Sequence, residues 1–240
     1  MMGSSTRSSG SSTPTPTPTP NPTHTMPTTH PWSLVPAADY EAHFGPEGAG
    51  LLAAFGGVFG RVYAARRPRR VALLALRTGA GLQHIDPSMT SRVVGLDVNL
   101  SFLAVARQRF LELGTRLELF CADAESAELE PGAFDLVHAA HALEYLDLRV
   151  VGPRIASWLA PGGACSVVLQ MGSLCEAEAG APATLRGAAT AGRLVTPEEV
   201  SGALGAEGLV ERRTFELALR GGRRLFAGLW ERPASGPAST

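Results

Sequence analysis

Residues 71–99, VALLALRTGAGLQHIDPSMTSRVVGLDVN, decide the fold of this chain. They open with an apolar run at 71–76, which is typical of a strand buried on both faces. Small residues at 78–81 then permit a tight turn and a close approach of the backbone to a ligand. A short helical patch at 82–85 and a second apolar strand at 93–96 follow, and this strand ends on Asp97. This order of strand, glycine turn, helix, strand and acid predicts a nucleotide-binding α/β unit. In such a unit the acid accepts hydrogen bonds from a ribose.

The rest of the chain continues the alternation of helices and strands. Apolar spacing predicts helices at 50–66, 100–113 and 141–159, and strands at 116–122, 134–140 and 164–171. A Thr-Pro-Glu-Glu sequence at 196–199 predicts the start of a further helix, and two alternating segments, 210–219 and 223–232, flank a Gly-Gly turn. The sequence therefore predicts an α/β fold. It is a Rossmann-like, doubly wound sheet of seven strands, mostly parallel, with a C-terminal antiparallel β-hairpin.

The composition along the chain suggests four parts. Residues 1–30 are rich in Ser, Thr and Pro and are expected to form a disordered tail, in which Met26 is a candidate start. Residues 31–70 form an N-terminal helical segment that begins with an irregular aromatic stretch, residues 71–232 form the main domain, and residues 233–240 form a second disordered tail. Residues 172–194 are either a lid or a surface insertion.

The composition and net charge of the chain exclude several classes of function. The chain has 240 residues and a formal net charge of −1, which gives no general reason to bind nucleic acid or an anionic membrane. All 21 basic residues are Arg, which excludes a Schiff-base lysine and a P-loop lysine. The three cysteines form no CxxC pair, so we predict no metal site and a reducing, cytoplasmic location. No apolar run approaches the ~20 residues that a membrane span requires.

Taken together, these segments resemble the class I S-adenosylmethionine (SAM)-dependent methyltransferases, with a bacterial methyltransferase-like subgroup nearest. The likeness covers residues 71–232, and its motifs are VALLALRTGAG, VVGLDVN, LFCAD, FDLVHAAHALEYL, LAPGGACSVVLQ and the closing hairpin. The resemblance implies SAM as the cofactor and a set of residues that bind it. That set is Ala75, Arg77, Gly79, Gly81, Asp97, Val98, Ala122, Asp123, Ala124 and His138.

Within that set, the resemblance implies distinct roles. The turn at Gly79 would face the methionine end of the cofactor, Asp97 the ribose, and Ala122 with Asp123 the adenine. The glycine loop departs from the family pattern, an acid followed by Gly at every second position, because Leu73, Ala75 and Arg77 precede Gly79. Arg77 either obstructs the cofactor or pairs with its carboxylate, and both alternatives stay open at this point.

Methyl transfer from a sulfonium needs a general base only if the acceptor must lose a proton. The candidate bases are His138, His141 and Glu144 after the fourth strand, together with Tyr40 from the N-terminal segment. We expect an enzyme that methylates a small-molecule acceptor, with no nucleic-acid or membrane partner and an oligomeric state that the sequence leaves open. The alternative is a non-catalytic or weakly SAM-binding module on the same fold. A nicotinamide-dependent oxidoreductase is disfavoured, since its fingerprint requires a small residue at His84.

Overall fold

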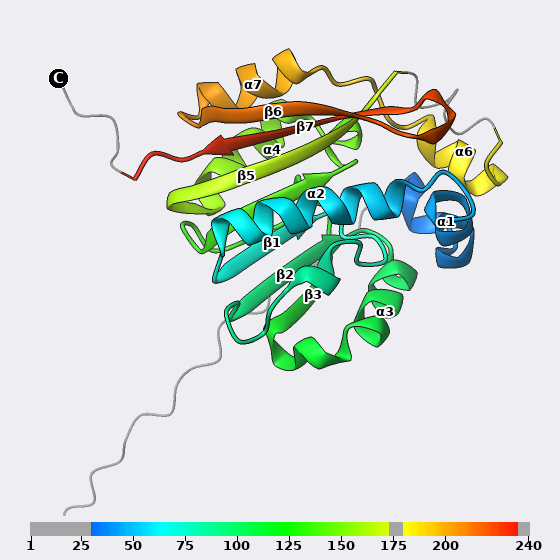
Figure 1. Ribbon diagram of the computed structural model, residues 1–240, viewed down its shortest axis with the longest axis horizontal. Coiled ribbons are helices and arrows are strands. Elements are labelled where there is room, and N and C mark those ends of the chain that lie inside the picture. Colours follow the sequence, from blue (N-terminus) through cyan, green and yellow to red (C-terminus); the bar gives the residue numbers. More distant parts are fainter. Residues whose placement is uncertain (1–29, 173–179, 235–240) are drawn as a thin grey trace, which may run out of the picture.

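A single seven-stranded sheet forms the centre of the molecule (Figure 1). The computed structural model describes residues 30–172 and 180–234. The expected tails at 1–30 and 233–240 lie almost wholly outside this range, as do residues 173–179 of the expected lid or insertion. The strand order is β3-β2-β1-β4-β5-β7-β6, and β7 alone runs antiparallel to its neighbours. The predicted architecture, mostly parallel with a C-terminal antiparallel hairpin, is confirmed.

The strands form where buried apolar runs occur in the sequence. Their bounds are β1 Arg70–Leu74, β2 Arg92–Asp97, β3 Leu117–Cys121, β4 Phe134–Ala140, β5 Leu159–Met171, β6 Val210–Ala218 and β7 Arg224–Glu231. The α-helices are α1 Ala37–Phe44, α2 Leu51–Arg66, α3 Leu100–Arg109, α4 Leu148–Trp158, α6 Ala183–Ala189 and α7 Pro197–Ala206. Short 3₁₀ segments are η1 Pro31–Leu34, η2 Leu82–His84, η3 Leu111–Arg116, η4 Leu143–Tyr145 and η5 Arg220–Gly222.

The prediction of one long helix at 141–159 is wrong. The segment instead contains η4 and α4, and strand β5 begins at Leu159, before the Pro-Gly-Gly sequence that was expected to separate helix from strand. The pairing of β5 with β4 explains the early start of this strand. Phe134 pairs with Leu159 and Leu136 with Ala164, so the extra residues of β5 form a bulge. Gly162 takes a left-handed conformation with φ of 76° in this bulge.

Two helical layers enclose the sheet. Helices α2 and α3 pack on one face, where Phe59, Leu103 and Phe110 meet apolar residues of β1 and β2. Helices α4 and α7 cover the other face. Helix α7 begins at a capping box in which Thr196 accepts a hydrogen bond from the Glu199 N–H and Glu199 accepts one from the Thr196 N–H, as the sequence predicted. Within the described residues, no helix is long and apolar enough to cross a membrane.

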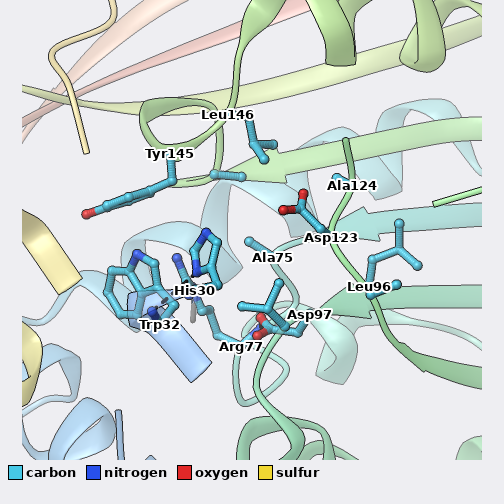
Figure 2. A pocket seen from close by; sticks show the side chains of 13 residues that line it. His30, Trp32, Ala75, Arg77, Leu96, Asp97, Asp123, Ala124, Tyr145 and Leu146 are labelled. Carbon is cyan, nitrogen blue, oxygen red and sulfur yellow. Dashed lines mark hydrogen bonds between the residues drawn. The ribbon is translucent and has the colours of Figure 1, made fainter. Parts of the chain in front are cut away.

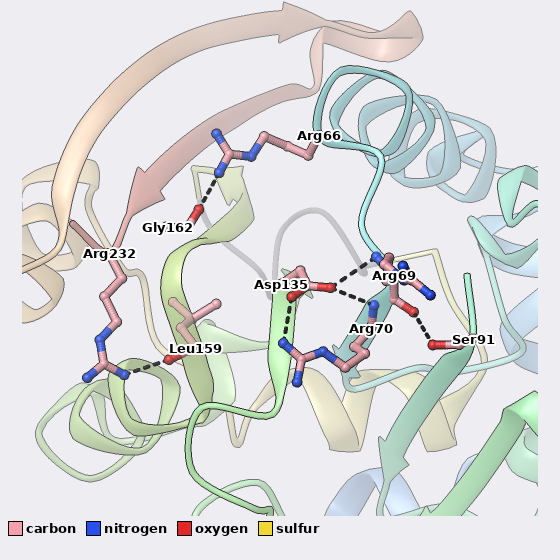
Figure 3. A network of polar contacts seen from close by, with 8 residues as sticks. All are labelled: Arg66, Arg69, Arg70, Ser91, Asp135, Leu159, Gly162 and Arg232. Carbon is pink, nitrogen blue, oxygen red and sulfur yellow. Dashed lines mark hydrogen bonds and ion pairs between the residues drawn. The ribbon is translucent and has the colours of Figure 1, made fainter. Parts of the chain in front are cut away.

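Arginines and one carboxylate tie the amino ends of the strands together (Figure 3). Asp135 accepts hydrogen bonds from the backbone N–H groups of Arg69 and Arg70. It also forms an ion pair with the Arg70 guanidinium at 2.8 Å. Arg66 donates to the carbonyl of Gly162 at 2.6 Å. Asp135 therefore has a structural role at this end of the sheet. Arg66 and Arg70 use their guanidinium groups in contacts within the protein, whereas Arg67 and Arg69 are exposed.

The N-terminal segment covers the opposite edge, where the parallel strands end. It contains η1 and α1, where the sequence predicted an irregular stretch, and α6 packs against η1 (Figure 1). Asn99 fixes this segment to the sheet because its side-chain amide donates to the carbonyls of Trp32 and Val35, each at 2.7 Å. The same side chain accepts from the Ser101 N–H and so caps α3. A residue immediately after β2 thus holds Trp32 beside the strand ends.

Candidate functional site

A narrow crevice lies at the carboxyl ends of β1 to β4 (Figure 2). The loops after three parallel strands supply its floor, the segment after β4 supplies one wall, and the N-terminal segment supplies the other. Its lining residues are His30, Trp32, Ala75, Arg77, Leu96, Asp97, Val98, Ala122, Asp123, Ala124, Ala142, Tyr145 and Leu146. Ligands of open α/β sheets bind at this edge, because loops from successive strands converge there.

Asp97, the last residue of β2, is the buried acid of this crevice. Its side chain is only 3% exposed. One carboxylate oxygen accepts the backbone N–H of Arg77 at 2.8 Å, and the other accepts that of Asn99 at 2.9 Å. Burial raises the pKa of Asp97, while the nearby positive charge of Arg77 and these two hydrogen bonds oppose that rise. Each oxygen keeps a second lone-pair direction, so the carboxylate can still accept hydrogen bonds from a ribose.

The loop after β1 keeps a glycine-type backbone although two of its glycines are replaced. Ala75 has φ of 50° and Arg77 has φ of 56°, followed by Gly79 at 92° and Gly81 at 111°. Left-handed φ values cost a residue with a side chain roughly 1–2 kcal/mol. The conformation that the family pattern encodes with glycine is therefore retained here against a local strain, and the departure concerns the side chains that project from the loop.

The Arg77 side chain projects into the crevice. In Figure 2 it extends from the loop toward Trp32 and His30, and its guanidinium carbon lies 3.7 Å from the centre of the Trp32 ring. Only 5% of the residue is exposed. Its Nη2 donates to the carbonyl of His141 at 3.4 Å, whereas its Nε finds no hydrogen-bond partner in the part of the chain that the structure describes. The arginine thus occupies the end of the crevice beyond Asp97.

The chemistry of the crevice lining suits one half of an adenosyl ligand. Asp97 and Asp123 offer carboxylates beside the small or apolar Ala122, Ala124 and Leu146, an arrangement suited to a ribose and a flat purine. The enclosed space is about 40 Å³, against roughly 300–1,000 Å³ for pockets that hold whole ligands. A tail on the ribose enters only when the Arg77 side chain moves, and the unpartnered Nε is a donor available to a carboxylate on that tail.

The structure brings together most of the residues that the sequence suggested for cofactor binding. Seven of them line the crevice, namely Ala75, Arg77, Asp97, Val98, Ala122, Asp123 and Ala124. Gly79 and Gly81 lie behind it. A Cβ on Gly79 would meet the Phe110 ring at 2.6 Å, and one on Gly81 would meet the Phe59 ring at 3.0 Å. Both glycines therefore serve close packing of the loop against α2 and α3.

His138 lies in the core, outside the lining of the crevice. It pairs in register with Leu73 and Ser166, and its ring contacts Phe59 of α2 at a centroid distance of 5.1 Å. Its Nδ1 is 3.2 Å from the Ser166 hydroxyl, while its Nε2 has no partner among the described residues. Burial lowers the pKa of His138 to about 4, so the ring is neutral at pH 7.

His141 and Tyr40 form the aromatic support behind Trp32. The His141 ring stacks on Phe55 at 5.9 Å and meets Trp32 edge-on at 6.2 Å. Tyr40 also meets Trp32 edge-on, with ring centroids 6.2 Å apart. Burial, helped by the positive charge of Arg77, lowers the pKa of His141 to about 3. Both residues are within the cluster that positions Trp32 and lie one layer away from the crevice.

Glu144 borders a second, wider space, which we call the lateral cleft. This cleft has a volume of about 720 Å³ and lies between η4, the start of α4, α7 and the segment between α6 and α7. Tyr145 and Leu146 line both the lateral cleft and the crevice, so the two spaces share a wall. Glu144 accepts the backbone N–H of Gln170 at 2.8 Å through Oε1, whereas Oε2 has no partner within residues 30–172 and 180–234. Burial raises the pKa of Glu144 to about 7.

Sequence reasoning missed several lining residues. Leu96, Ala142 and Leu146 lie within the motifs VVGLDVN and FDLVHAAHALEYL but were not singled out as site residues. His30 and Trp32 precede the main domain, and neither was expected to line the site. Asn99 was the available signal for Trp32, because an Asn directly after a strand and before a helix is a strong capping residue with spare donors. Within the described residues, no group of three or more His, Cys, Asp or Glu side chains is arranged to hold a metal ion.

Comparison with known proteins agrees with this geometry. Residues 71–163 match a family model described as a methyltransferase domain. Over these residues the chain is therefore similar to a methyltransferase domain. Outside this match, the sheet continues through β7 and β6, and the N-terminal segment adds the Trp32 wall to the matched region. A comparison with curated proteins found no match.

Solved structures share the fold at low sequence identity. The N-methyltransferase NodS from Bradyrhizobium japonicum, in complex with S-adenosyl-L-homocysteine (SAH), gives a TM-score of 0.61 at 16% identity, over 81% of this chain and 91% of that one. Phosphoethanolamine N-methyltransferase 2 from Haemonchus contortus gives 0.64 at 16% identity, and the match covers 82% of this chain but only 57% of that protein. The [4+2]-cyclase SpnF gives 0.58 at 14% identity, over 73% of this chain and 81% of that one. These likenesses establish the fold alone, which supports different chemistries.

Proposed function

We propose that this protein is a SAM-dependent methyltransferase that acts on a small molecule. The observation that carries the proposal is the buried carboxylate of Asp97 at the carboxyl end of β2, inside the crevice that the loops after parallel strands form. The methyltransferase-domain match over residues 71–163 supports the same conclusion. As predictions from the sequence, we retain a cytoplasmic location and an acceptor that is neither nucleic acid nor membrane.

Different residues of the crevice bind different parts of the ligand. Asp97 binds the ribose hydroxyls, and Asp123 with Ala122 and Ala124 binds the adenine against Leu146. When bound, the cofactor supplies a methyl group on a sulfonium, which is a good electrophile. The chain's part in catalysis is to hold the donor and acceptor in line and to keep water out, which positioned side chains achieve without covalent chemistry.

The lateral cleft is the place that we propose for the acceptor. It shares Tyr145 and Leu146 with the crevice, so a molecule in the cleft lies next to the bound cofactor. Glu144, with its unpartnered Oε2 and a pKa of about 7, is the residue that can take a proton from the acceptor at neutral pH. Arg149 and Arg193 also line the cleft, but each forms an ion pair with an acid of the same lining, Asp147 at 2.6 Å and Glu199 at 2.8 Å, so their charges are already matched within the protein.

Calorimetric titration of the purified protein with SAH tests the adenosyl site. We expect saturable binding by the wild type and its loss in Asp97→Ala. Asp135→Ala is a matched control because Asp135 also accepts two backbone N–H bonds, but at the opposite end of the sheet. Asp135→Ala is expected to lose thermal stability and to keep its affinity for SAH. The absence of heat from the wild type at high micromolar SAH would overturn the proposal.

A non-catalytic binding or regulatory module is the second candidate, and the position of the Arg77 side chain favours it. If this side chain stays against Trp32, the tail of the methyl donor has no room and transfer does not occur. Restoring the family residue with Arg77→Gly separates the candidates. Methyl transfer by the wild type supports the enzyme, whereas transfer that appears only in Arg77→Gly supports the module.

A further inference from the structure

The guanidinium of Arg77 forms no ion pair with the residues that the structure describes. Within residues 30–172 and 180–234, no carboxylate lies within ion-pair distance of its guanidinium, and its hydrogen bonding is limited to the 3.4 Å contact with the His141 carbonyl. An ionised side chain that is 95% removed from solvent is costly unless donors and charge are matched. Arg77 therefore has the properties of a receptor for an anion that comes from outside the chain.

Aromatic rings hold the guanidinium in position without satisfying its N–H groups. Its central carbon is 3.7 Å from the Trp32 ring centre, 5.9 Å from that of Tyr145 and 6.0 Å from that of Phe102. Stacking on a ring face attracts a cation and leaves the N–H edge of the guanidinium free for hydrogen bonds in its own plane. Such an edge is suited to the two oxygens of a carboxylate or a phosphate.

The position of this edge relative to the ribose site follows from the backbone. The N–H of Arg77 donates to Asp97, the proposed ribose ligand, so the Arg77 side chain starts directly beside the sugar. A substituent on the 5′ carbon of that sugar is the part of the ligand that comes closest to it. The other ionisable groups of the crevice are Asp97, Asp123, His30 and the phenol of Tyr145, and burial lowers the pKa of His30. Near pH 7, Arg77 is therefore the cation of the crevice.

The chain also lacks a group for a cationic tail. The family pattern has an acid where this chain has Leu73, which is packed in the core beneath α2. Relative to that pattern, one negative charge is missing and one positive charge is added. The methyl donor carries an ammonium and a sulfonium beside its carboxylate, and both cations are unfavourable near Arg77.

We propose that Arg77 makes the crevice selective for adenosine ligands with an anionic 5′ substituent and no neighbouring cation, of which adenosine 5′-monophosphate (AMP) is the simplest. The inference rests on the adenosine site of the proposed function and assigns the chemical class of a second ligand. Adenine nucleotides then compete with the methyl donor for the crevice. SAH, the demethylated form of the donor, binds more tightly than SAM.

Calorimetric titration with adenosine, AMP, SAH and SAM tests the proposal on the whole chain. AMP is expected to bind the wild type at least about ten-fold more tightly than adenosine, as one charge-assisted hydrogen bond provides. Arg77→Met keeps the length of the stem without its donors and is expected to abolish this difference while it retains adenosine binding. Arg67→Met is the matched control, because Arg67 is an exposed arginine with φ of 48° outside the crevice.

Each result decides the proposal. Equal affinities of the wild type for adenosine and AMP overturn it, as does a preference for AMP that persists in a folded Arg77→Met. SAM that binds the wild type more tightly than SAH also overturns it, and this ligand comparison needs no variant. If adenosine itself fails to bind, the adenosyl site of the proposed function fails as well, which distinguishes that failure from a failure of the charge selectivity alone.

Discussion

The guanidinium carbon of Arg77 lies 3.7 Å above the ring of Trp32, although 45 positions separate the two residues in the chain. The contact joins the loop after β1 to the N-terminal segment that Asn99 anchors. One wall of the crevice thus depends on a segment outside the 71–163 match, and this segment has a measurable structural role.

Replacing Trp32 is expected to destabilise the protein strongly. Trp32→Ala removes a side chain that is 1% exposed and is expected to cost about 3 kcal/mol, as large-to-small changes of buried aromatics do. Urea denaturation measures the loss. Leu34→Ala in the same η1 segment is the control, because Leu34 is 72% exposed and its change is expected to alter stability by less than about 0.5 kcal/mol. Similar losses for the two variants contradict the assignment of Trp32 to the core.

Glu144 is expected to make the protein less stable as the pH rises. Its folded pKa, about 7, exceeds its usual 4.5, so the folded state favours the protonated form. The corresponding stabilisation is fully present below pH 4.5 and is lost as the pH rises through 7. Glu144→Gln lacks this contribution. The free energy of unfolding of the variant minus that of the wild type, measured by urea denaturation, is therefore expected to be larger at pH 8 than at pH 5. Glu112→Gln, an exposed site, should show no such trend.

His138 is expected to act in the opposite direction. Its folded pKa of about 4 is below the usual 6.5, so its stabilisation is present above pH 6.5 and is lost as the pH falls toward 4. His138→Leu is expected to weaken the loss of stability over that range, as measured by thermal unfolding at a series of pH values. Methyl transfer at pH 8 should persist in any folded His138 variant, since this ring does not line the crevice. A folded variant without activity would place the imidazole in the mechanism.

Two glycines are expected to respond oppositely to the same substitution. Gly79→Ala places a methyl group 2.6 Å from the Phe110 ring at a residue with φ of 92°, and we expect a loss of about 2 kcal/mol. Gly57→Ala in α2 has no heavy atom within 4 Å of the added carbon, and we expect a gain of about 1 kcal/mol from helix propensity. Thermal melts compare them. Equal effects contradict the packing role of Gly79.

The sequence predicted those parts of the fold whose signals are local. The apolar run of β4 and the Thr-Pro-Glu-Glu cap of α7 have the predicted limits, because strand burial and capping depend on neighbouring residues. The helix predicted at 141–159 begins only at Leu148, where the Asp147 side chain caps it, and ends at Trp158. Strand β5 includes the Pro-Gly-Gly sequence that follows because of a bulge in its pairing with β4. Local patterns contain no information on such pairing.

The same distinction holds in the crevice. The role of Asp97 was predictable from its place at a strand end. The direction of the Arg77 side chain depends on its contact with Trp32, and nothing in the sequence indicated that these two residues are close. The sequence did contain a signal for the position of His138. Residues two apart on a strand share a face, and Leu136 packs beneath α2, so His138 was expected to lie on the same face.

The order of the strands also bears on how the chain assembles at the ribosome. Strand β6 leaves the ribosome before β7, yet β7 is the strand that connects β6 to the remainder of the sheet. Until Arg224–Glu231 has been synthesised, β6 has no native neighbour, and the hydrogen-bonding edge of β5 is open as well. The final eight-residue strand thus completes two unfinished edges at once. A nascent chain halted before Arg224 is expected to require a chaperone that covers both.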